Sequence, residues 1–261
     1  MMDSIDNSGS AFVLDAVTKA YPETVALAPL SLTIARGERI ALVGPSGAGK
    51  TTLLNLLGGV TQPDQGRIWI HGQPLAGFKP GRELASLVGI IHQQFDLVPS
   101  LAVVHNVLAG RLGRWSLARS LVSLVSPRER YRALQALESV GIADKVYERT
   151  SRLSGGEQQR VAVARLLVQD PRIILADEPV ASLDPARAQD MLGLLSDITT
   201  ERGETLVASL HVVDLVRRCF SRVIGLRSGE LQFDIPAGEL TEEILERLYE
   251  IKGVVACADV R

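Results

Sequence analysis

Gly44-Pro45-Ser46-Gly47-Ala48-Gly49-Lys50-Thr51 stands between two apolar stretches of the chain. The preceding residues 39–43 predict a buried strand, and residues 52–57 predict the start of a helix. In a strand–loop–helix setting, glycines let the backbone approach a phosphate, and the helix N-terminus favours negative charge. We call residues 44–51 the glycine-rich loop, and with Thr52 it predicts a nucleotide phosphate site. The alternative is a glycine-rich turn before an ordinary core helix.

Two side chains of this loop have separate predicted roles. Lys50 supplies a positive charge for the β- and γ-phosphates of a nucleotide. The hydroxyl of Thr51 is a natural ligand for Mg²⁺.

The composition is that of an ordinary globular protein. The chain has 261 residues, is 46% hydrophobic and carries a net charge of −2, which suits one large α/β domain or two lobes sharing a core. Without a basic excess, nucleic acid is not an expected partner. Cys219 and Cys257 have no metal-ligand spacing. No apolar run reaches the roughly 20 residues of a membrane-spanning helix, and the polar N-terminus predicts no signal peptide.

Two adjacent carboxylates follow a second apolar run. Residues 172–176 predict a strand inside a parallel sheet, and Asp177-Glu178-Pro179 comes directly after it. Carboxylates at such a place are costly unless they face a cation or a ligand. We therefore expect Asp177 to hold Mg²⁺ and Glu178 to deprotonate a water that attacks the γ-phosphate.

Two further predicted strands end in polar residues. Residues 88–91 lead to Gln93 and Gln94, and residues 205–209 lead to His211. Ligand contacts in α/β proteins gather at the carboxyl ends of strands. The alternatives are a solvated loop glutamine and a structural histidine.

The stretch Leu153-Ser154-Gly155-Gly156-Glu157-Gln158-Gln159-Arg160 predicts the start of another helix. Ser154 and Glu157 have the spacing of a capping box. Gly155 and Gly156 leave the helix N-terminus bare, so that a phosphate can approach its free N–H groups. The alternative is merely a well-capped helix. We call residues 153–160 the signature segment.

The rest of the chain supplies further elements. Tyr21 is either a packing residue or a flat ring that stacks on a nucleotide base. Residues 110–132 form a basic amphipathic segment, read either as a solvated helix face or as a surface that docks to an anionic membrane or a partner helix. We expect strands at 12–17, 27–34 and 67–70, a hairpin turn at 36–38, helical structure over 101–166, a hairpin over 223–233 and a helix capped by Thr241.

Taken together, these motifs resemble the ATP-binding subunits of ABC transporters in order and approximate spacing. The resemblance covers roughly residues 12–250 and implies a P-loop NTPase α/β core with a mostly parallel sheet, an N-terminal antiparallel β subdomain and an α-helical signature subdomain. It implies one domain over 1–261, with the core and β subdomain at about 12–100 and 167–250 and the helical subdomain at about 101–166.

The resemblance also implies roles for the site residues. Two subunits pair head to tail as a homodimer, with ATP and Mg²⁺ as cofactors. Each ATP lies between the glycine-rich loop of one subunit and the signature segment of the other. The resemblance implies that Tyr21 stacks on adenine and that Thr51, Asp177 and Gln93, favoured over Gln94, bind Mg²⁺. It implies catalytic roles for Glu178 and His211. At the partner's ATP it implies Ser154, Gly155, Gly156 and Glu157, and at the dimer contact Ser182 and Asp184.

Within that family, residues 91–98, 176–185 and 210–215 look like those of the phosphonate-importer ATPases. This likeness implies import of phosphonates or related reduced-phosphorus anions. It implies two membrane-spanning permease subunits, an external solute-binding protein and a location on the cytoplasmic side of the inner (plasma) membrane. Alternatives are an ABC exporter or lipoprotein-release ATPase, and a soluble phosphotransferase, against which the signature segment argues. A non-transport ABC protein is disfavoured because no second ATP-binding domain or long coiled coil is present.

Overall fold

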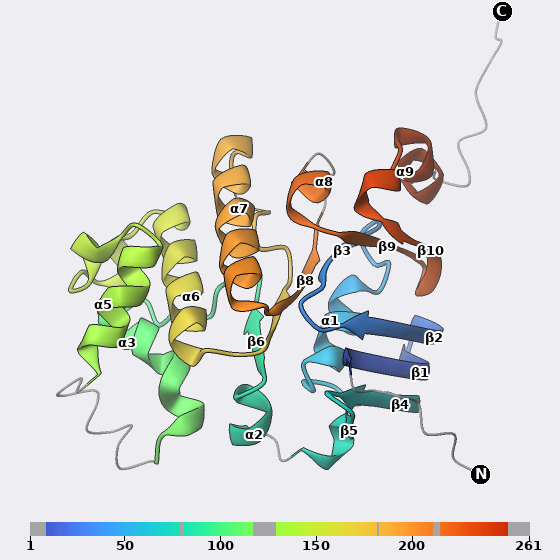
Figure 1. The fold of residues 1–261 in the computed structure, drawn as a ribbon, viewed down its shortest axis with the longest axis horizontal. Coiled ribbons are helices and arrows are strands. Elements are labelled where there is room, and N and C mark those ends of the chain that lie inside the picture. The colour runs from blue at the N-terminus through green and yellow to red at the C-terminus, as the bar shows by residue number, and fades with distance from the viewer. Residues whose placement is uncertain (1–8, 79–80, 117–128, 182, 211–214, 250–261) are drawn as a thin grey trace, which may run out of the picture.

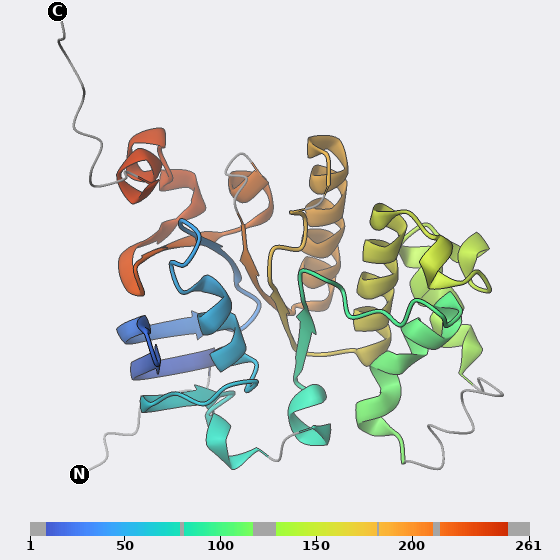
Figure 2. The same ribbon diagram turned by 180° about the vertical axis from the view of Figure 1, so that it is seen from behind.

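A computed structural model describes residues 9–78, 81–116, 129–181, 183–210 and 215–249 (Figure 1). A four-stranded sheet lies at one end of the molecule, and the helices α3, α5 and α6 lie at the other. A six-stranded sheet runs between them, and the view from behind gives the same arrangement (Figure 2). This is the α/β fold with an antiparallel subdomain and a helical end that the sequence predicts.

The six-stranded sheet has the order β10-β9-β3-β8-β7-β6. Neighbouring strands are parallel except that β10 pairs antiparallel with β9 at one edge. The expected strands at 39–43, 88–91 and 205–209 and the hairpin over 223–233 are confirmed. The strands are β3 (Arg39–Val43), β6 (Val88–Ile91), β7 (Ile173–Ala176), β8 (Thr205–Ser209), β9 (Arg222–Arg227) and β10 (Glu230–Pro236).

The four-stranded sheet has the order β2-β1-β4-β5 and is antiparallel throughout. Its strands are β1 (Ser10–Tyr21), β2 (Thr24–Ala35), β4 (Gln65–Ile70) and β5 (Gln73–Pro74). The prediction that residues 36–38 form a hairpin turn is wrong. A turn is present, but it connects two sheets, because β2 pairs with β1 while β8 and β9 occupy both edges of β3.

Within the expected helical region over 101–166, the described residues form several separate helices. Gly110 lies against the backbone of α6, and Ala102 bridges to Arg149, so the chain turns back at several points instead of continuing one helix. The helices are α1 (Lys50–Leu57), α2 (Arg82–Ala85), α3 (Val103–Leu108), α5 (Arg130–Ser139), α6 (Gly155–Gln169), α7 (Pro185–Arg202), α8 (Val216–Cys219) and α9 (Glu242–Tyr249). Short 3-10 turns span Leu75–Gly77, Ala109–Arg114, Ala143–Lys145, Thr150–Arg152 and Ala237–Glu239.

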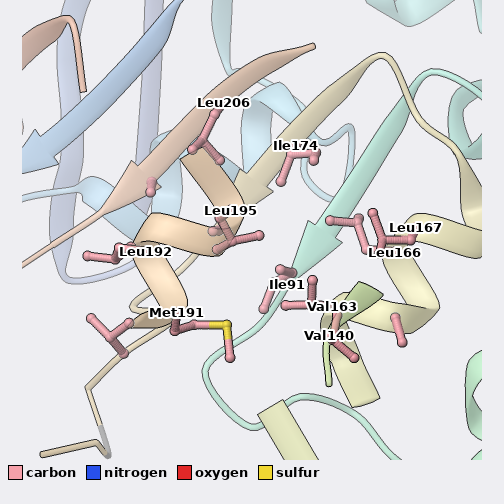
Figure 3. Close-up of a cluster of buried hydrophobic side chains, with 14 of the residues drawn as sticks. Ile91, Val140, Val163, Leu166, Leu167, Ile174, Met191, Leu192, Leu195 and Leu206 are labelled. Carbon is pink, nitrogen blue, oxygen red and sulfur yellow. The ribbon is translucent and has the colours of Figure 1, made fainter. Parts of the chain in front are cut away.

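Hydrophobic clusters cover both faces of the six-stranded sheet. On one face, Ile91, Ile174 and Leu206 of the strands pack with α6 and α7 (Figure 3). On the other face, Leu175 and Val207 belong to a cluster formed with α1 and the antiparallel sheet. Successive residues of a strand point to opposite faces, so burial on both sides explains why these strands are apolar throughout. In the ranges that the structure describes, no helix is long and apolar enough to cross a membrane.

Glu204 is a buried carboxyl just before β8. Its side chain is 5% exposed, and Arg202 Nη1 lies 3.7 Å from its Oε1. Its Oε2 has no hydrogen-bond partner among the described residues. Burial raises the pKa of Glu204 from its ordinary value of 4.5 to about 6, partly opposed by Arg202. The folded protein therefore holds a proton on Glu204 that the unfolded chain releases between pH 4.5 and 6.

This shift predicts that the fold loses stability as pH rises from 4.5 to 6, by at most about 2 kcal/mol. Glu204→Gln removes the titrating group and with it that part of the pH dependence. Urea denaturation of parent and variant at several pH values between 4.5 and 7.5 measures the difference. Glu201→Gln, at an exposed position on α7, is the control. A Glu204→Gln variant with the same pH dependence as the parent contradicts the assignment.

Candidate functional site

The glycine-rich loop is wedged between two strands. A Cβ at Gly44 would overlap the carbonyl oxygen of Leu226 in β9, and a Cβ at Gly49 would lie 2.5 Å from the carbonyl oxygen of Ala26 in β2. Gly49 also has a φ of 101°, which favours glycine. Helix α1 begins directly after it with no side-chain cap, so its first N–H groups remain available to an anion. The predicted strand–loop–helix setting is confirmed.

Lys50 is buried and folds back over this loop. Its Nζ donates hydrogen bonds to the carbonyl oxygens of Gly44 at 2.7 Å and Pro45 at 3.1 Å. Burial lowers the pKa of Lys50, while the charges of Glu178 and Asp177 oppose this change. The two carboxylates therefore act on Lys50 through space, and the fold brings the two predicted motifs to one site.

The carboxylates are held by the neighbouring strand. The hydroxyl of Ser209, at the end of β8, donates to Asp177 Oδ1 at 2.7 Å and accepts from the N–H of Glu178 at 2.8 Å. Glu178 has a φ of 48°, a strained conformation of the kind that gathers at functional sites. Sequence reasoning missed Ser209; its signal is a fully buried hydroxyl at the end of an apolar strand.

The glutamine pair lies on the loop that follows β6. Gln93 and Gln94 are exposed, and Arg165 of α6 clamps the residues after them. Its guanidinium donates to the carbonyl oxygens of Phe95 at 2.7 Å and Asp96 at 2.8 Å. The clamp connects this loop to the signature segment's own helix. Sequence reasoning missed Arg165, since an arginine inside a helix is ordinarily interpreted as a surface residue.

The signature segment is capped as predicted. Ser154 is the N-cap of α6, and its hydroxyl accepts from the N–H of Glu157 at 3.4 Å. Glu157 Oε2 accepts from the N–H of Ser154 at 2.8 Å, which lowers the pKa of Glu157. The capping-box prediction is thus confirmed. No described residue lies within 4 Å of a Cβ placed on Gly155, so this part of the chain leaves the helix N-terminus open.

A hollow of about 400 Å³ adjoins this open terminus. It lies between α6 and α7, and its lining includes Ser154, Gly156 and Arg187. Gln159 also lines it, although its side chain is only 1% exposed. Neither the amide oxygen nor the amide nitrogen of Gln159 has a hydrogen-bond partner within the described residues. An unpaired buried amide is costly, so Gln159 marks this hollow as a place for a polar partner.

The remaining predicted residues take different positions. Tyr21 is exposed at the end of β1, with Lys19 Nζ 5.8 Å from its ring centre. Asp184 is the N-cap of α7 and accepts from the N–H of Arg187 at 3.1 Å. Ser182 and His211 lie outside the described residues, as do residues 117–128 of the basic segment.

One chain does not bring the signature segment to the glycine-rich loop. Helix α1 lies beside the antiparallel sheet, whereas α6 lies at the helical end, with strands of the six-stranded sheet between them (Figures 1 and 2). The chain therefore has two separate sites. One holds Lys50, Asp177 and Glu178, and the other is the open N-terminus of α6.

Comparison with curated proteins gives a consistent result. The chain is 51% identical to the "Phosphonates import ATP-binding protein PhnC" of Anaeromyxobacter dehalogenans over 94% of its own length, although it spans only 49% of that relative. It is 49% identical to "Phosphonates import ATP-binding protein PhnC 1" of Pseudomonas aeruginosa, covering 86% of this chain and 85% of the relative. It is 45% identical to the "Phosphonates import ATP-binding protein PhnC" of Pseudomonas putida, covering 93% of this chain and 91% of the relative.

Solved structures share the fold. The dimeric bacterial ABC transporter cassette MJ0796 is 33% identical with a TM-score of 0.76, and its post-hydrolysis state bound to ADP and Pi is 32% identical with a TM-score of 0.75. Each comparison covers 87% of this chain and 98% of the other. The family model described as "ABC transporter" matches residues 27–181, more than half of the chain. This chain belongs to the ABC transporter family.

Proposed function

We propose that this chain is the ATP-hydrolysing subunit of an ABC importer for phosphonates or related reduced-phosphorus anions. The observation that supports the ATPase assignment is the buried Lys50 of the glycine-rich loop, which interacts electrostatically with Asp177 and Glu178. The solute class rests on the names of the three relatives above, all described as phosphonate import ATP-binding proteins. The importer's other subunits would select the solute.

ATP binding would use the whole glycine-rich loop. The N–H groups of Gly47, Ala48, Gly49 and the first residues of α1, including Thr52, surround the phosphates. Lys50 exchanges its two backbone carbonyl partners for the β- and γ-phosphates, which offer charge-assisted hydrogen bonds in their place. Exposed Tyr21 offers its ring face to the adenine base.

Mg²⁺ fits the oxygen donors beside this loop. Thr51, Asp177 and Gln93 supply a hydroxyl, a carboxylate and an amide oxygen, the ligand types that Mg²⁺ prefers. Asp177 Oδ1 accepts from Ser209, and its Oδ2 has no hydrogen bond among the described residues. Among the residues that the structure describes, no group of three or more His, Cys, Asp or Glu could hold a metal ion by itself. When bound, Mg²⁺ neutralises charge on the phosphates.

Glu178 would act as the general base. Its backbone N–H donates to the hydroxyl of Ser209, which ties the backbone of Glu178 to the end of β8. It takes a proton from the water that attacks the γ-phosphate. We assign His211, which follows β8 in the sequence, to the same reaction as a catalytic residue.

Hydrolysis would require two copies of the chain. In a head-to-tail homodimer, the open terminus of α6 completes the partner's ATP site through Ser154, Gly155, Gly156 and Glu157. The hollow beside it, lined in part by Gln159, is the place that we assign to the partner's nucleotide. Ser182 and Asp184 lie at the dimer contact. The solved dimers of MJ0796 support such pairing.

The assembly would sit at the cytoplasmic side of the inner (plasma) membrane as a peripheral part. We propose two membrane-spanning permease subunits and an external solute-binding protein as partners, and no nucleic acid. The chain forms one ATP-binding domain over 1–261, in which residues of about 101–166 form the helical subdomain. The basic segment at 110–132 is proposed to contact a permease.

Deletion of the gene tests the solute. The deletion strain is expected to lose growth on a phosphonate as sole phosphorus source and to keep normal growth on phosphate. The parent gene restores growth, and a Lys50→Ala copy does not. Growth of the deletion strain on every reduced-phosphorus compound, with no redundant transporter present, rejects the solute and leaves the ATPase assignment standing.

Glu178→Gln is expected to keep ATP binding and to lower hydrolysis by about 10² to 10⁴, the usual effect of removing a positioned base. Equilibrium binding of a fluorescent ATP analogue and phosphate release measure the two properties. Glu230→Gln, at an exposed position on β10, is the matched control and should keep both. Hydrolysis at the parent's rate in Glu178→Gln would exclude this residue as the base.

Ser154→Arg is expected to leave ATP binding by the isolated chain intact and to lower hydrolysis at least about 100-fold, because the new side chain fills the partner's phosphate site. Ser151→Arg, exposed three residues earlier, is the control. Mixing Ser154→Arg with Lys50→Ala should recover measurable hydrolysis, since one composite site per mixed dimer stays intact. Normal hydrolysis by Ser154→Arg alone is incompatible with the composite site.

A further inference from the structure

The C-terminal helix α9 reaches the glycine-rich loop. The N–H of Gly44 donates a hydrogen bond to the hydroxyl of Tyr249 at 3.2 Å, joining residues that are 205 positions apart. Gly44 lies at the start of the loop, and Tyr249 is the last residue of α9. Neither the motifs nor the predicted roles of the site residues use this tyrosine.

Gly44 also contacts Lys50. Its carbonyl oxygen accepts from Lys50 Nζ at 2.7 Å, while its Cα faces the carbonyl of Leu226 so closely that no side chain fits there. The N–H, the Cα and the carbonyl of one residue are therefore each in contact with a different element. Any shift of Gly44 moves the backbone group on which Lys50 rests.

Helix α9 is firmly attached to the rest of the protein. Leu248 is buried, and Ile244 and Leu245 pack against the larger core cluster. Arg227 Nη1 donates to the carbonyl oxygen of Arg247 at 2.8 Å, and Thr241 Oγ1 accepts from the N–H of Ile244 at 3.3 Å. The hydroxyl of Tyr249 is thus held in place by its helix. Burial raises the pKa of Tyr249, so the phenol stays neutral at physiological pH.

The same part of the chain contacts the loop at a second point. In the turn between β9 and β10, the N–H of Gly229 donates to the carbonyl oxygen of Ala48 at 3.1 Å. Tyr249 contacts the beginning of the glycine-rich loop, and Gly229 contacts a residue near its end. The C-terminal segment therefore braces the loop at both ends.

We propose that Tyr249 is a positioning residue for nucleotide binding. By accepting from the Gly44 N–H, it fixes the start of the glycine-rich loop and so sets the position from which Lys50 meets the phosphates. This inference rests on the proposed ATP binding. It assigns to the C-terminal helix a part in holding the nucleotide, by way of the backbone of Gly44.

Tyr249→Phe tests the proposal because it keeps the packed ring and removes only the hydroxyl. The loss of one such hydrogen bond predicts a KM for ATP that rises by about 3- to 10-fold, more than kcat falls. The amide hydrogen of Gly44 should exchange faster with solvent. Tyr147→Phe is the matched control, because Tyr147 is 62% exposed and distant in sequence from the loop. It should change neither KM nor Gly44 exchange.

The outcomes separate the two proposals. A parent protein that binds no ATP rejects the proposed function itself. A parent that binds ATP, with the same KM in Tyr249→Phe and Tyr147→Phe, rejects only the role of Tyr249. A fall in kcat at unchanged KM also overturns it, because the hydroxyl would then act during turnover. Thermal denaturation of both variants checks the fold, and a raised KM in Tyr249→Phe at the parent's melting temperature supports positioning rather than general loss of structure.

Discussion

The close contact between Gly44 and the carbonyl of Leu226 fixes where the chain turns after β3, and the rest of the site depends on that turn. Strand β3 lies between β8 and β9 and runs parallel to both, so the carboxyl ends of these strands lie along one edge of the sheet. The ends of β7 and β8 lie along the same edge and carry Asp177 and Ser209. Sheet order thus gathers a cation, two carboxylates and a hydroxyl from three segments of the chain.

A second connection joins this edge to the helical end. Arg165 of α6 holds the backbone after Gln93 through two carbonyl oxygens, and the same helix presents Ser154 at its N-terminus. Arg165 and the N-cap Ser154 therefore belong to one helix, α6, which contacts the loop after β6 and carries the open terminus. The arginine thereby links a loop beside the candidate Mg²⁺ ligands to a surface that would face another subunit.

The elements that depend on short, local sequence patterns could be predicted from the sequence. Strands β3, β6 and β8 agree with the predicted limits, because each is a short apolar run bounded by polar or glycine residues. The pairing of Lys50 with the acidic residues was also predictable, since parallel strands bring their carboxyl ends to one edge. The turn at 36–38 was misassigned because a local turn does not reveal whether the strands on each side share a sheet.

Several site residues could not be predicted because their roles arise only from long-range packing. Ser209 and Arg165 look like an ordinary strand residue and an ordinary helix residue, and the fold alone gives them their partners. Gln159 differs in that its burial leaves it without partners. Residues 101–166 show the same limit, since close backbone approaches such as that of Gly110 divide a stretch whose composition suits continuous helix. The roles of His211 and Ser182 stay predictions.

The hydrogen bond that spans 205 residues has a consequence for biosynthesis. The glycine-rich loop is translated before the residues that brace it and before both strands that flank β3, and Tyr249 follows Gly44 by 205 positions. At ordinary translation rates that delay is roughly 10 to 40 seconds. During that interval β3 has two unpaired edges and an apolar surface, the features that promote aggregation. The nascent chain therefore most needs chaperone protection after the glycine-rich loop has been translated and before the segments that pack against it have been translated.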